Sequence, residues 1–316
     1  MVKTYTLAVN VFNGGERFAK TLASIEKVHN LFDEVYISIT ETEKSHVDFE
    51  NCKKFKIPNL KINKYHEPGC KNHFINTIKN LNTDFVLFLG HDDICHEDGI
   101  IEAKYSLENS DGSIAFYGSN LIQDKNVTQK QVIIEYDKLY SSSDFILKRI
   151  SSEFYLNVSG VFNSVASLRR TIPLMLLNGE SYWLDMIAIT TPYTKFIKQT
   201  KNPLCTIHFH EDQMSKNVSN FEDYCKDGIW FHFFAIFNEE NIERLPLYFR
   251  ELKRLGSYIN FKSFINFLIS LFINSPFSKH LHFDRYLMIT LFIIKLNLEF
   301  YISNFRVFKF NFRRYS

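Results

Sequence analysis

Short apolar runs alternate with amphipathic stretches along the first ninety residues. The runs rich in β-branched, aromatic and aliphatic residues predict strands over Thr4 to Val11, Glu34 to Ile39, Leu60 to Tyr65 and Phe85 to Leu89. After a turn at Asn13-Gly14-Gly15, Phe18, Leu22 and Ile25 recur at helical spacing, and Asn72 to Leu81 predicts a second helix. Strands alternating with helices predict an α/β fold with a mostly parallel sheet covered by helices.

The pattern continues beyond the fourth strand with less regular spacing. The further strands that it predicts are Ile114 to Ile122, Gln131 to Tyr136 and Pro203 to His210. The further helices that it predicts are Ser143 to Ile150, Thr171 to Leu177, Trp183 to Thr190 and Glu222 to Asn238. Pro173 falls near the start of the second of these helices, where proline is tolerated.

The composition changes from Leu245 onward. Residues 245–316 hold 11 Lys and Arg against 3 Asp and Glu, and they contain 13 of the 32 phenylalanines. The first 244 residues hold 26 basic against 32 acidic residues, so an acidic body carries a basic, aromatic extension. We therefore divide the chain into a domain over 1–244 and a helical amphipathic region over 245–316.

The apolar stretches of this extension are too short to span a membrane, because Asn266, Pro276 and Lys295 interrupt them. One interpretation is a helical region that packs on the domain or on a second copy of the chain. The interpretation that we favour is peripheral contact with an anionic membrane, through sunken aromatic and outward basic side chains. No nucleic-acid motif accompanies the extension, so a nucleic-acid partner is not expected.

The 316 residues are 45% hydrophobic and 23% charged, which is typical of one large or two small globular domains. The five cysteines are odd in number and never spaced as Cys-x-x-Cys, which argues against a disulfide framework and a structural zinc site. The first residues run directly into a strand pattern without a signal peptide. We expect a cytoplasmic protein, placed at the inner face of the membrane by its extension.

Polar residues follow each of the first four strands. These polar ends are Asn10 to Gly15, Thr40-Glu41, His66 to Gly69 and Asp92-Asp93. Because ligands bind at the carboxyl edge of open α/β sheets, we expect the four ends to form one site. Acids at the second and fourth ends suit a nucleotide with its ribose on a carboxylate and its diphosphate on a divalent metal. The paired aspartates could instead cap the helix that follows them.

The order of these segments resembles the family 2 glycosyltransferases, which have the GT-A (Rossmann-like) fold. The segments that carry the resemblance are Leu7 to Gly14, Phe18 to Ile25, Gly69 to Asn76, Phe88-Leu89-Gly90-His91-Asp92-Asp93, Ser159 to Asp185 and Ile207 to Ser215. The resemblance covers about residues 4–217, with a nucleotide-sugar half over about 1–95 and an acceptor half over about 96–244. It implies transfer of a sugar from a nucleoside-diphosphate sugar, with inversion at the anomeric carbon.

The resemblance also implies roles for individual residues. The implied nucleotide-sugar-binding residues are Asn10, Phe12, Asn13, Glu41, Asn76 and Asp92, the implied metal ligands are Asp92, Asp93 and His210, and the implied base is Asp185. The chain departs from the family pattern at several positions of this site: Glu41 replaces an Asp, Ile75 an Arg, and Gly90 the first Asp of the Asp-x-Asp-Asp signature. In addition, Asn10 replaces a Pro or Thr, Phe12 a Tyr, and His208 an Arg. Lys71 or His73 could substitute for the missing arginine.

The chemistry of these residue types is coherent on its own terms. A departing diphosphate needs its charge neutralised, which Mn²⁺ or Mg²⁺ held by Asp93 and Asp92 can supply. The attacking hydroxyl needs a carboxylate base on the opposite face of the sugar, and Asp185 is the best candidate. The acceptor that we expect is a glycan or lipid-linked glycan of a bacterial surface polysaccharide. The sequence does not identify the nucleotide, the sugar or the oligomeric state, and a homo-oligomer is possible.

Each of these residues also has an ordinary structural interpretation. Asp185 could cap a helix, His210 could be a buried histidine at a strand end, and Glu41 could be a solvated loop acid. Two other functions remain open. A metal-dependent phosphoesterase could use His91, the aspartate pair and His208 to Asp212. A scaffold that binds a nucleotide sugar without turnover would also fit the departures from the family pattern.

Overall fold

The computed structural model describes residues 2–67, 69–110, 114–117, 121–124, 127–130, 138–141, 144–145, 159–177, 194 and 196–209. The chain divides into two compact units, residues 1–219 and 220–316, and all the described residues belong to the first unit. The predicted boundary at 244 and the extension over 245–316 lie outside the described residues and stay predictions. Within the described part of the chain, no helix is both long and apolar enough to cross a membrane.

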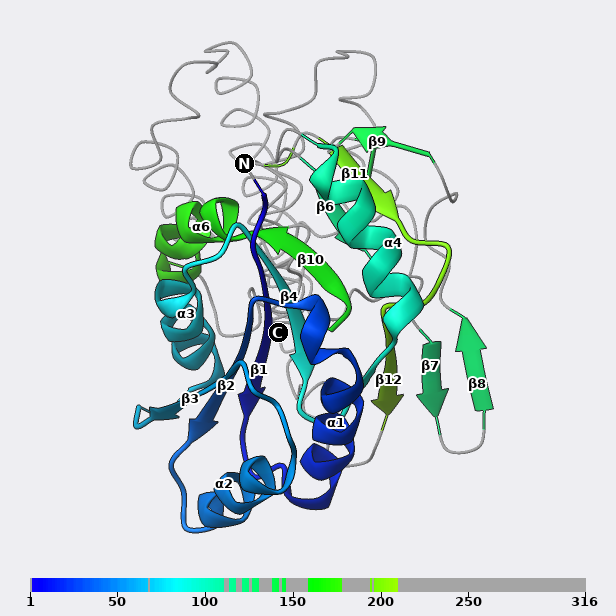
Figure 1. Ribbon diagram of the computed structural model, residues 1–316. Helices are drawn as coiled ribbons and strands as arrows, with labels where there is room; N and C mark the ends of the chain where they lie inside the picture. The colour runs from blue at the N-terminus through cyan, green and yellow to red at the C-terminus, as the bar shows by residue number, and fades with distance from the viewer. Residues whose placement is uncertain are drawn as a thin grey trace, which may run out of the picture. The chain divides into compact units, whose positions relative to one another are not determined.

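Eight of the described strands form the larger sheet of the first unit (Figure 1). They are β1 (Tyr5–Val11), β2 (Glu34–Thr40), β3 (Leu60–Tyr65), β4 (Phe85–Gly90), β6 (Ile114–Tyr117), β9 (Tyr140–Ser141), β10 (Val161–Ser164) and β11 (Phe196–Gln199). Their order is β3-β2-β1-β4-β10-β6-β11-β9. The first four are parallel to one another, and β10 is antiparallel to both of its neighbours. The predicted α/β fold with a mixed, mostly parallel sheet is confirmed.

Four other described strands form a smaller sheet in the order β5-β12-β7-β8. They are β5 (Ile94–Cys95), β7 (Leu121–Asp124), β8 (Val127–Lys130) and β12 (Cys205–Phe209). The two-residue strand β5 follows the aspartate pair directly and pairs antiparallel with β12. The smaller sheet therefore begins at the point where the larger sheet presents its acidic strand end.

Helices lie on both faces of the larger sheet. They are α1 (Gly15–Val28), α2 (Ser45–Lys54), α3 (Cys70–Asn80), α4 (Glu97–Glu108) and α6 (Val165–Leu177), with a short 3₁₀ helix η1 (His29–Leu31) after α1. Alternate residues of β1, such as Leu7 and Val9, join the core that also contains Phe18 and Leu22 of α1. On the other face Phe74 of α3 packs on Phe88 of β4, with 4.5 Å between ring centroids. In Figure 1, α1 and α2 lie together at the arrowhead end of β1, and α3 lies beside α6.

The structure corrects several of the predicted elements. The stretch Ile114 to Ile122 is not one strand, because β6 and β7 belong to different sheets. Helix α6 begins at Val165 instead of Thr171, so that Pro173 lies in its second half and not near its start. The sequence pattern misses α2 altogether. It allows for a helix after the aspartate pair without giving its bounds; this helix is α4, whose N-cap residue is His96 and neither aspartate. The predicted elements at Gln131 to Tyr136, Trp183 to Thr190 and Glu222 to Asn238 lie outside the described residues, as does most of Ser143 to Ile150.

Candidate functional site

The polar strand ends meet where the order of the strands reverses. The chain builds β1, β2 and β3 in one direction along the sheet and then places β4 on the other side of β1. Asn10 of β1 is in register with Ser38 of β2 and with Gly90 of β4. In open α/β sheets such a switch point leaves a crevice at the carboxyl ends of the strands, where ligands bind. The candidate site is therefore the edge formed by the ends of β1 to β4.

The turn after β1 presents an aromatic ring to solvent. Phe12 is 54% exposed, which is unusual for a phenylalanine directly following a buried strand. Asn13 has a positive φ of 50°, a conformation that asparagine tolerates better than most residues. Its side-chain oxygen accepts a hydrogen bond of 2.6 Å from the hydroxyl of Thr42, in the loop after β2. The predicted residues Phe12 and Asn13 thus lie at the same edge, linked to the end of β2.

The sequence analysis did not identify Asp48, whose carboxylate binds the turn after β1. Asp48 of α2 is fully buried and accepts hydrogen bonds from the backbone N–H groups of Gly14, at 3.1 Å, and Gly15, at 2.7 Å. Asn51, one helical turn further along α2, donates to the carbonyl of Gly15 at 2.9 Å. The start of α1 is therefore capped by another helix instead of its own N-cap residue. Only the inward side of α2 could have revealed this role, and α2 itself was not predicted.

Glu41 lies at the end of β2, within reach of two basic side chains. Its carboxylate is 2.6 Å from Nδ1 of His66 and 3.4 Å from Nζ of Lys64, both on the neighbouring β3 side. Its backbone N–H donates to the carbonyl of Tyr65 at 2.8 Å. All three side chains are substantially exposed, so these contacts hold the loop only weakly. Glu41 remains accessible to a ligand at the sheet edge.

The buried imidazole of His73 supports this strand end from α3. Nε2 lies 2.7 Å from the hydroxyl of Ser38, and Nδ1 lies 3.1 Å from the hydroxyl of Thr40. The ring stacks on Tyr65 with 4.3 Å between centroids and 4° between planes. Burial lowers the pKa of His73 to about 4, against a smaller opposing effect of its bond to Ser38. His73 is therefore neutral near pH 7, and it does not supply the positive charge of the missing arginine.

Helix α3 also fixes the polar residue of β1. The hydroxyl of Thr77 donates to the side-chain oxygen of Asn10 at 2.7 Å. Asn76, which the resemblance assigned to the nucleotide sugar, accepts a 3.0 Å hydrogen bond from Asn80 on its own helix, and its predicted role stays a prediction. Thr77, one position further along, joins His73 in holding the strand ends from α3.

The two aspartates after β4 occupy different environments. Asp92 is partly exposed, whereas Asp93 is only 3% exposed. Both oxygens of Asp93 accept hydrogen bonds, from the hydroxyl of Ser159 and from the backbone N–H of His208 at 3.0 Å. Burial, with a further effect of the Asp92 charge, raises the pKa of Asp93 against the lowering effect of these hydrogen bonds. The pair is therefore one accessible carboxylate and one internal carboxylate.

This geometry limits how a metal ion could be held. No group of three or more His, Cys, Asp and Glu side chains suited to an ion occurs among the described residues. Asp92 is partly exposed, whereas both carboxylate oxygens of Asp93 accept hydrogen bonds within the protein. His210 and Asp185 lie outside the described residues, so the rest of the predicted metal and catalytic set stays a prediction.

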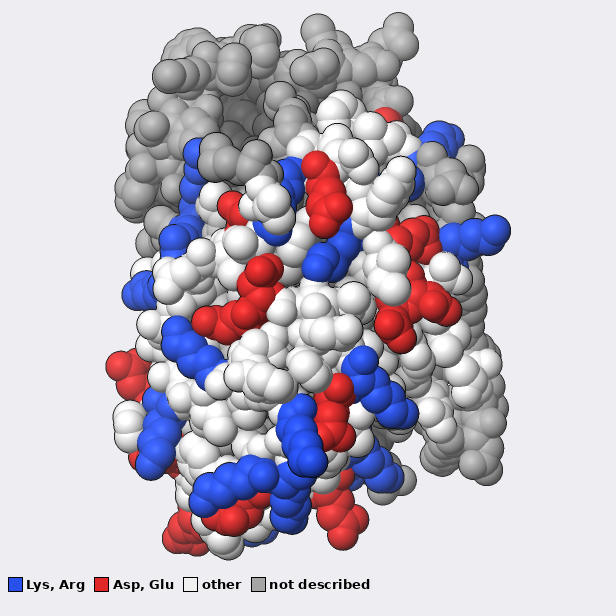
Figure 2. Space-filling model, in the orientation of Figure 1, with Lys and Arg blue, Asp and Glu red and all other residues white. Residues whose placement is uncertain are grey.

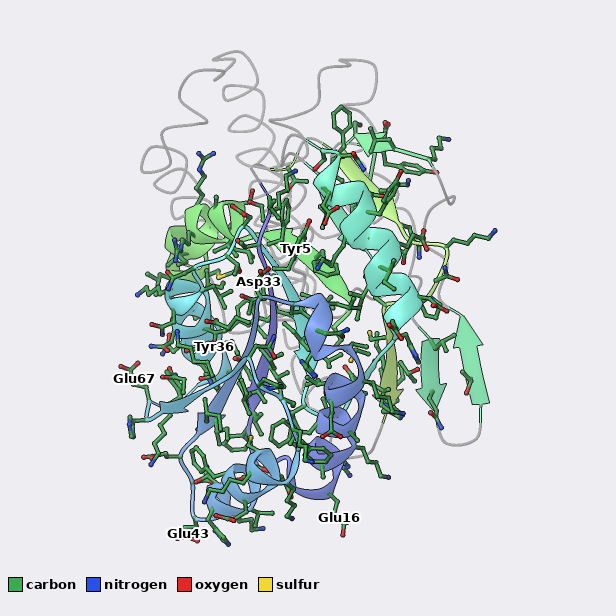
Figure 3. All side chains as sticks on the ribbon, viewed as in Figure 1. Tyr5, Glu16, Asp33, Tyr36, Glu43 and Glu67 are labelled. Atoms are coloured by element: carbon green, nitrogen blue, oxygen red, sulfur yellow. The ribbon has the colours of Figure 1, made fainter. Side chains whose placement is uncertain are left out.

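Charges of both signs surround the edge. Figure 2 shows basic and acidic residues interspersed over the described part of this face. In Figure 3, Glu16 and Glu43 project outward around the arrowhead ends of β1 and β2, whereas Tyr5 and Asp33 lie near the start of β1. There the carboxylate of Asp33 accepts a 2.7 Å hydrogen bond from the backbone N–H of Tyr5. Glu16, in the first turn of α1, and Glu43, in the loop after β2, are thus exposed, while Asp33 has a structural partner.

Comparison with known proteins agrees with this architecture. No family model and no curated protein matches the sequence. Among solved structures, S. aureus TarS 1-349 in complex with UDP-GlcNAc has a TM-score of 0.57 at 13% identity, covering 82% of each chain. TarS 1-349 in complex with UDP gives 0.54 at 13% identity and the same coverage. A longer TarS structure gives 0.51 at 11% identity, covering 82% of this chain and 50% of that one. The chain therefore shares the GT-A-type α/β fold of TarS.

Proposed function

We propose that the protein is an inverting glycosyltransferase that moves a sugar from a nucleoside-diphosphate sugar to a hydroxyl of a glycan or lipid-linked glycan. The observation that carries the proposal is the gathering of Phe12, Asn13, Glu41 and Asp92 at the switch point of the sheet. The shared fold with TarS, which was crystallised with UDP-GlcNAc and UDP, supports the same class of donor. Surface polysaccharide synthesis remains the expected setting.

The described residues suggest different roles for the side chains at this edge of the sheet. The exposed ring of Phe12 offers an apolar surface for a nucleobase. In this proposal Glu41 accepts hydrogen bonds from the base or the ribose hydroxyls, and Asp92 serves the diphosphate. A divalent ion bound at Asp92 would neutralise charge on the departing phosphate. Asp185 is proposed to take the proton of the acceptor hydroxyl.

A thermal-shift panel of UDP, GDP, dTDP and CDP, each with and without Mn²⁺, tests the donor site. We expect one nucleotide to raise the melting temperature, and we expect Glu41→Gln to reduce that rise. Glu43→Gln is the matched control, because Glu43 is an exposed acid of the same loop. If no nucleotide stabilises the protein in either condition, the proposed donor site is wrong.

A turnover assay separates the possible enzymes. With the nucleotide sugar that binds best, release of the nucleotide that depends on an added glycan acceptor indicates sugar transfer. Release of inorganic phosphate from phosphate esters would indicate the metal-dependent phosphoesterase. Binding without turnover of any sugar nucleotide, with every acceptor tested, would indicate the scaffold.

A further inference from the structure

One buried carboxylate connects the two sheets of the described unit. Asp93 follows β4, and its oxygens accept hydrogen bonds from Ser159, just before β10, and from His208 in β12. β10 belongs to the larger sheet and β12 to the smaller one. With only 3% of the residue exposed, the carboxylate faces the protein interior instead of the open edge. Asp93 thus links the loop that carries Asp92 to two segments far along the chain.

Gly90 is part of the same arrangement. A Cβ atom at position 90 would lie 2.5 Å from Oδ2 of Asp93 and 2.9 Å from Oδ1 of Asp92, closer than real Cβ contacts allow. The backbone N–H of Gly90 donates to the hydroxyl of Ser159 at 2.7 Å, and its carbonyl accepts from the N–H of Asp93 at 3.1 Å. The backbone of Gly90 does not adopt a positive φ. Space, and not backbone conformation, therefore requires glycine here.

We propose that Asp93 is a positioning residue and that Gly90 and Asp93 form a coupled pair. In this arrangement the Asp93 carboxylate fastens β10 and β12 to the end of β4, and this fixes the loop that presents Asp92. The Asp93 carboxylate occupies the space that an acidic side chain at position 90 would need. This chain therefore lacks an acid at position 90 and has the internal hydrogen bonds of Asp93 in its place. Only the role of Asp92, which this contact positions, rests on the proposed function. The coupling itself is a property of the fold.

A double-mutant cycle tests the coupling without any ligand. Gly90→Ala should lower the urea midpoint of unfolding in the wild-type background. In the Asp93→Ala background most of that decrease should disappear, because the nearer colliding carboxylate is gone. Gly69→Ala is the matched control: Gly69 has a positive φ of 102°, so alanine is strained there, and its decrease should be the same in both backgrounds. An equal effect of Gly90→Ala in both backgrounds would overturn the coupling.

The rise in melting temperature induced by UDP and Mn²⁺ tests the positioning role. An asparagine at 93 can still accept from the N–H of His208 and can donate to the hydroxyl of Ser159. We therefore expect Asp93→Asn to keep most of the UDP-induced rise and Asp93→Ala to lose most of it. If Asp93→Asn abolishes the Mn²⁺-dependent part of the rise, Asp93 is a metal ligand and the proposal is wrong.

A purely structural role has a different signature. It would lower the melting temperature of both variants but leave the UDP-induced rise unchanged in each, which also overturns positioning. If the wild-type protein responds to no nucleotide, the proposed function fails, and the urea cycle alone decides on the coupling. Because Asp93→Asn replaces one group by another of the same shape, it gives a result even if Gly90→Ala does not fold.

Discussion

Removal of the Asp48 carboxylate should destabilise the protein through the turn that follows β1. Asp48 is fully buried, and its carboxylate accepts hydrogen bonds from the backbone N–H groups of Gly14 and Gly15. Among the described residues these two N–H groups have no other acceptor. Asp48→Ala leaves the N–H of the buried Gly14 without an acceptor. It also removes a negative charge from the N-terminus of α1, where such a charge is stabilising.

The magnitude follows from these two losses. An unpaired buried N–H costs about 1–3 kcal/mol. The N–H of Gly15 is only partly buried, so water replaces part of its bond, and the loss of the charge at the helix start costs about 0.5–1 kcal/mol. Together we expect Asp48→Ala to lower the free energy of unfolding by about 3 kcal/mol. Asp48→Asn retains one carbonyl oxygen and should lose about half of that.

Urea unfolding followed by circular dichroism and tryptophan fluorescence measures these differences. A loss of about 3 kcal/mol corresponds to a decrease of roughly 6–12 °C in melting temperature for a unit of this size. Glu50→Ala is the matched control, because Glu50 lies on the same helix and its contact with Lys53 is exposed; it should leave the midpoint unchanged. If Asp48→Ala stays within about 0.5 kcal/mol of the wild type, the capping role assigned to Asp48 is refuted.

Three further predictions concern other parts of the chain. The pKa of His73 is 6.5 in the unfolded chain and about 4 in the folded chain. The neutral side chain therefore contributes fully to stability above pH 6.5, and this contribution disappears as the pH falls to about 4. His73→Gln should therefore lose less stability than the wild type between pH of about 7 and about 4.5 in urea unfolding; equal losses would contradict this. Gly99→Ala should cost about 1–3 kcal/mol in the same assay, because its methyl group meets the carbonyl group of Pro203, and a neutral effect would mean that α4 can shift. Deletion of residues 259–316 should release the protein from anionic liposomes in a sedimentation assay, whereas unchanged partitioning would exclude the extension as the membrane contact.

The parallel half of the larger sheet could be predicted because β-branched, aromatic and aliphatic residues recur in each of its strands. β1 and β4 begin and end within one residue of the predicted limits. The polar residues that follow these runs then placed the candidate site at the edge, since the topology of a parallel sheet brings such ends together. These features depend on short stretches of sequence and on a general rule of chain topology.

Contacts between distant segments could not be predicted in the same way. α2 was missed because its inward side carries Ser45, Asp48 and Asn51, so that it lacks the apolar stripe by which a helix is recognised. Asp93 is buried and Asp92 is not, because Ser159 and His208 bind the Asp93 carboxylate. The sequence pattern does not connect these distant residues with the aspartates. α6 was predicted too short: the predicted helix begins at Thr171, with Pro173 tolerated near its start, whereas the helix begins at Val165 and continues through Pro173.

The contacts of Asp93 also set an order of events during synthesis. Proteins are made from the N-terminus, and their early segments can begin to fold before the rest has been made. β1 to β4 are complete once Gly90 has been made, but Ser159 follows Asp93 by 66 residues and His208 by 115. Until then the Asp93 carboxylate lacks both of these partners, and its hydration opposes burial. The parallel strands can therefore assemble early on the ribosome, but the acidic loop closes only after β12 has emerged.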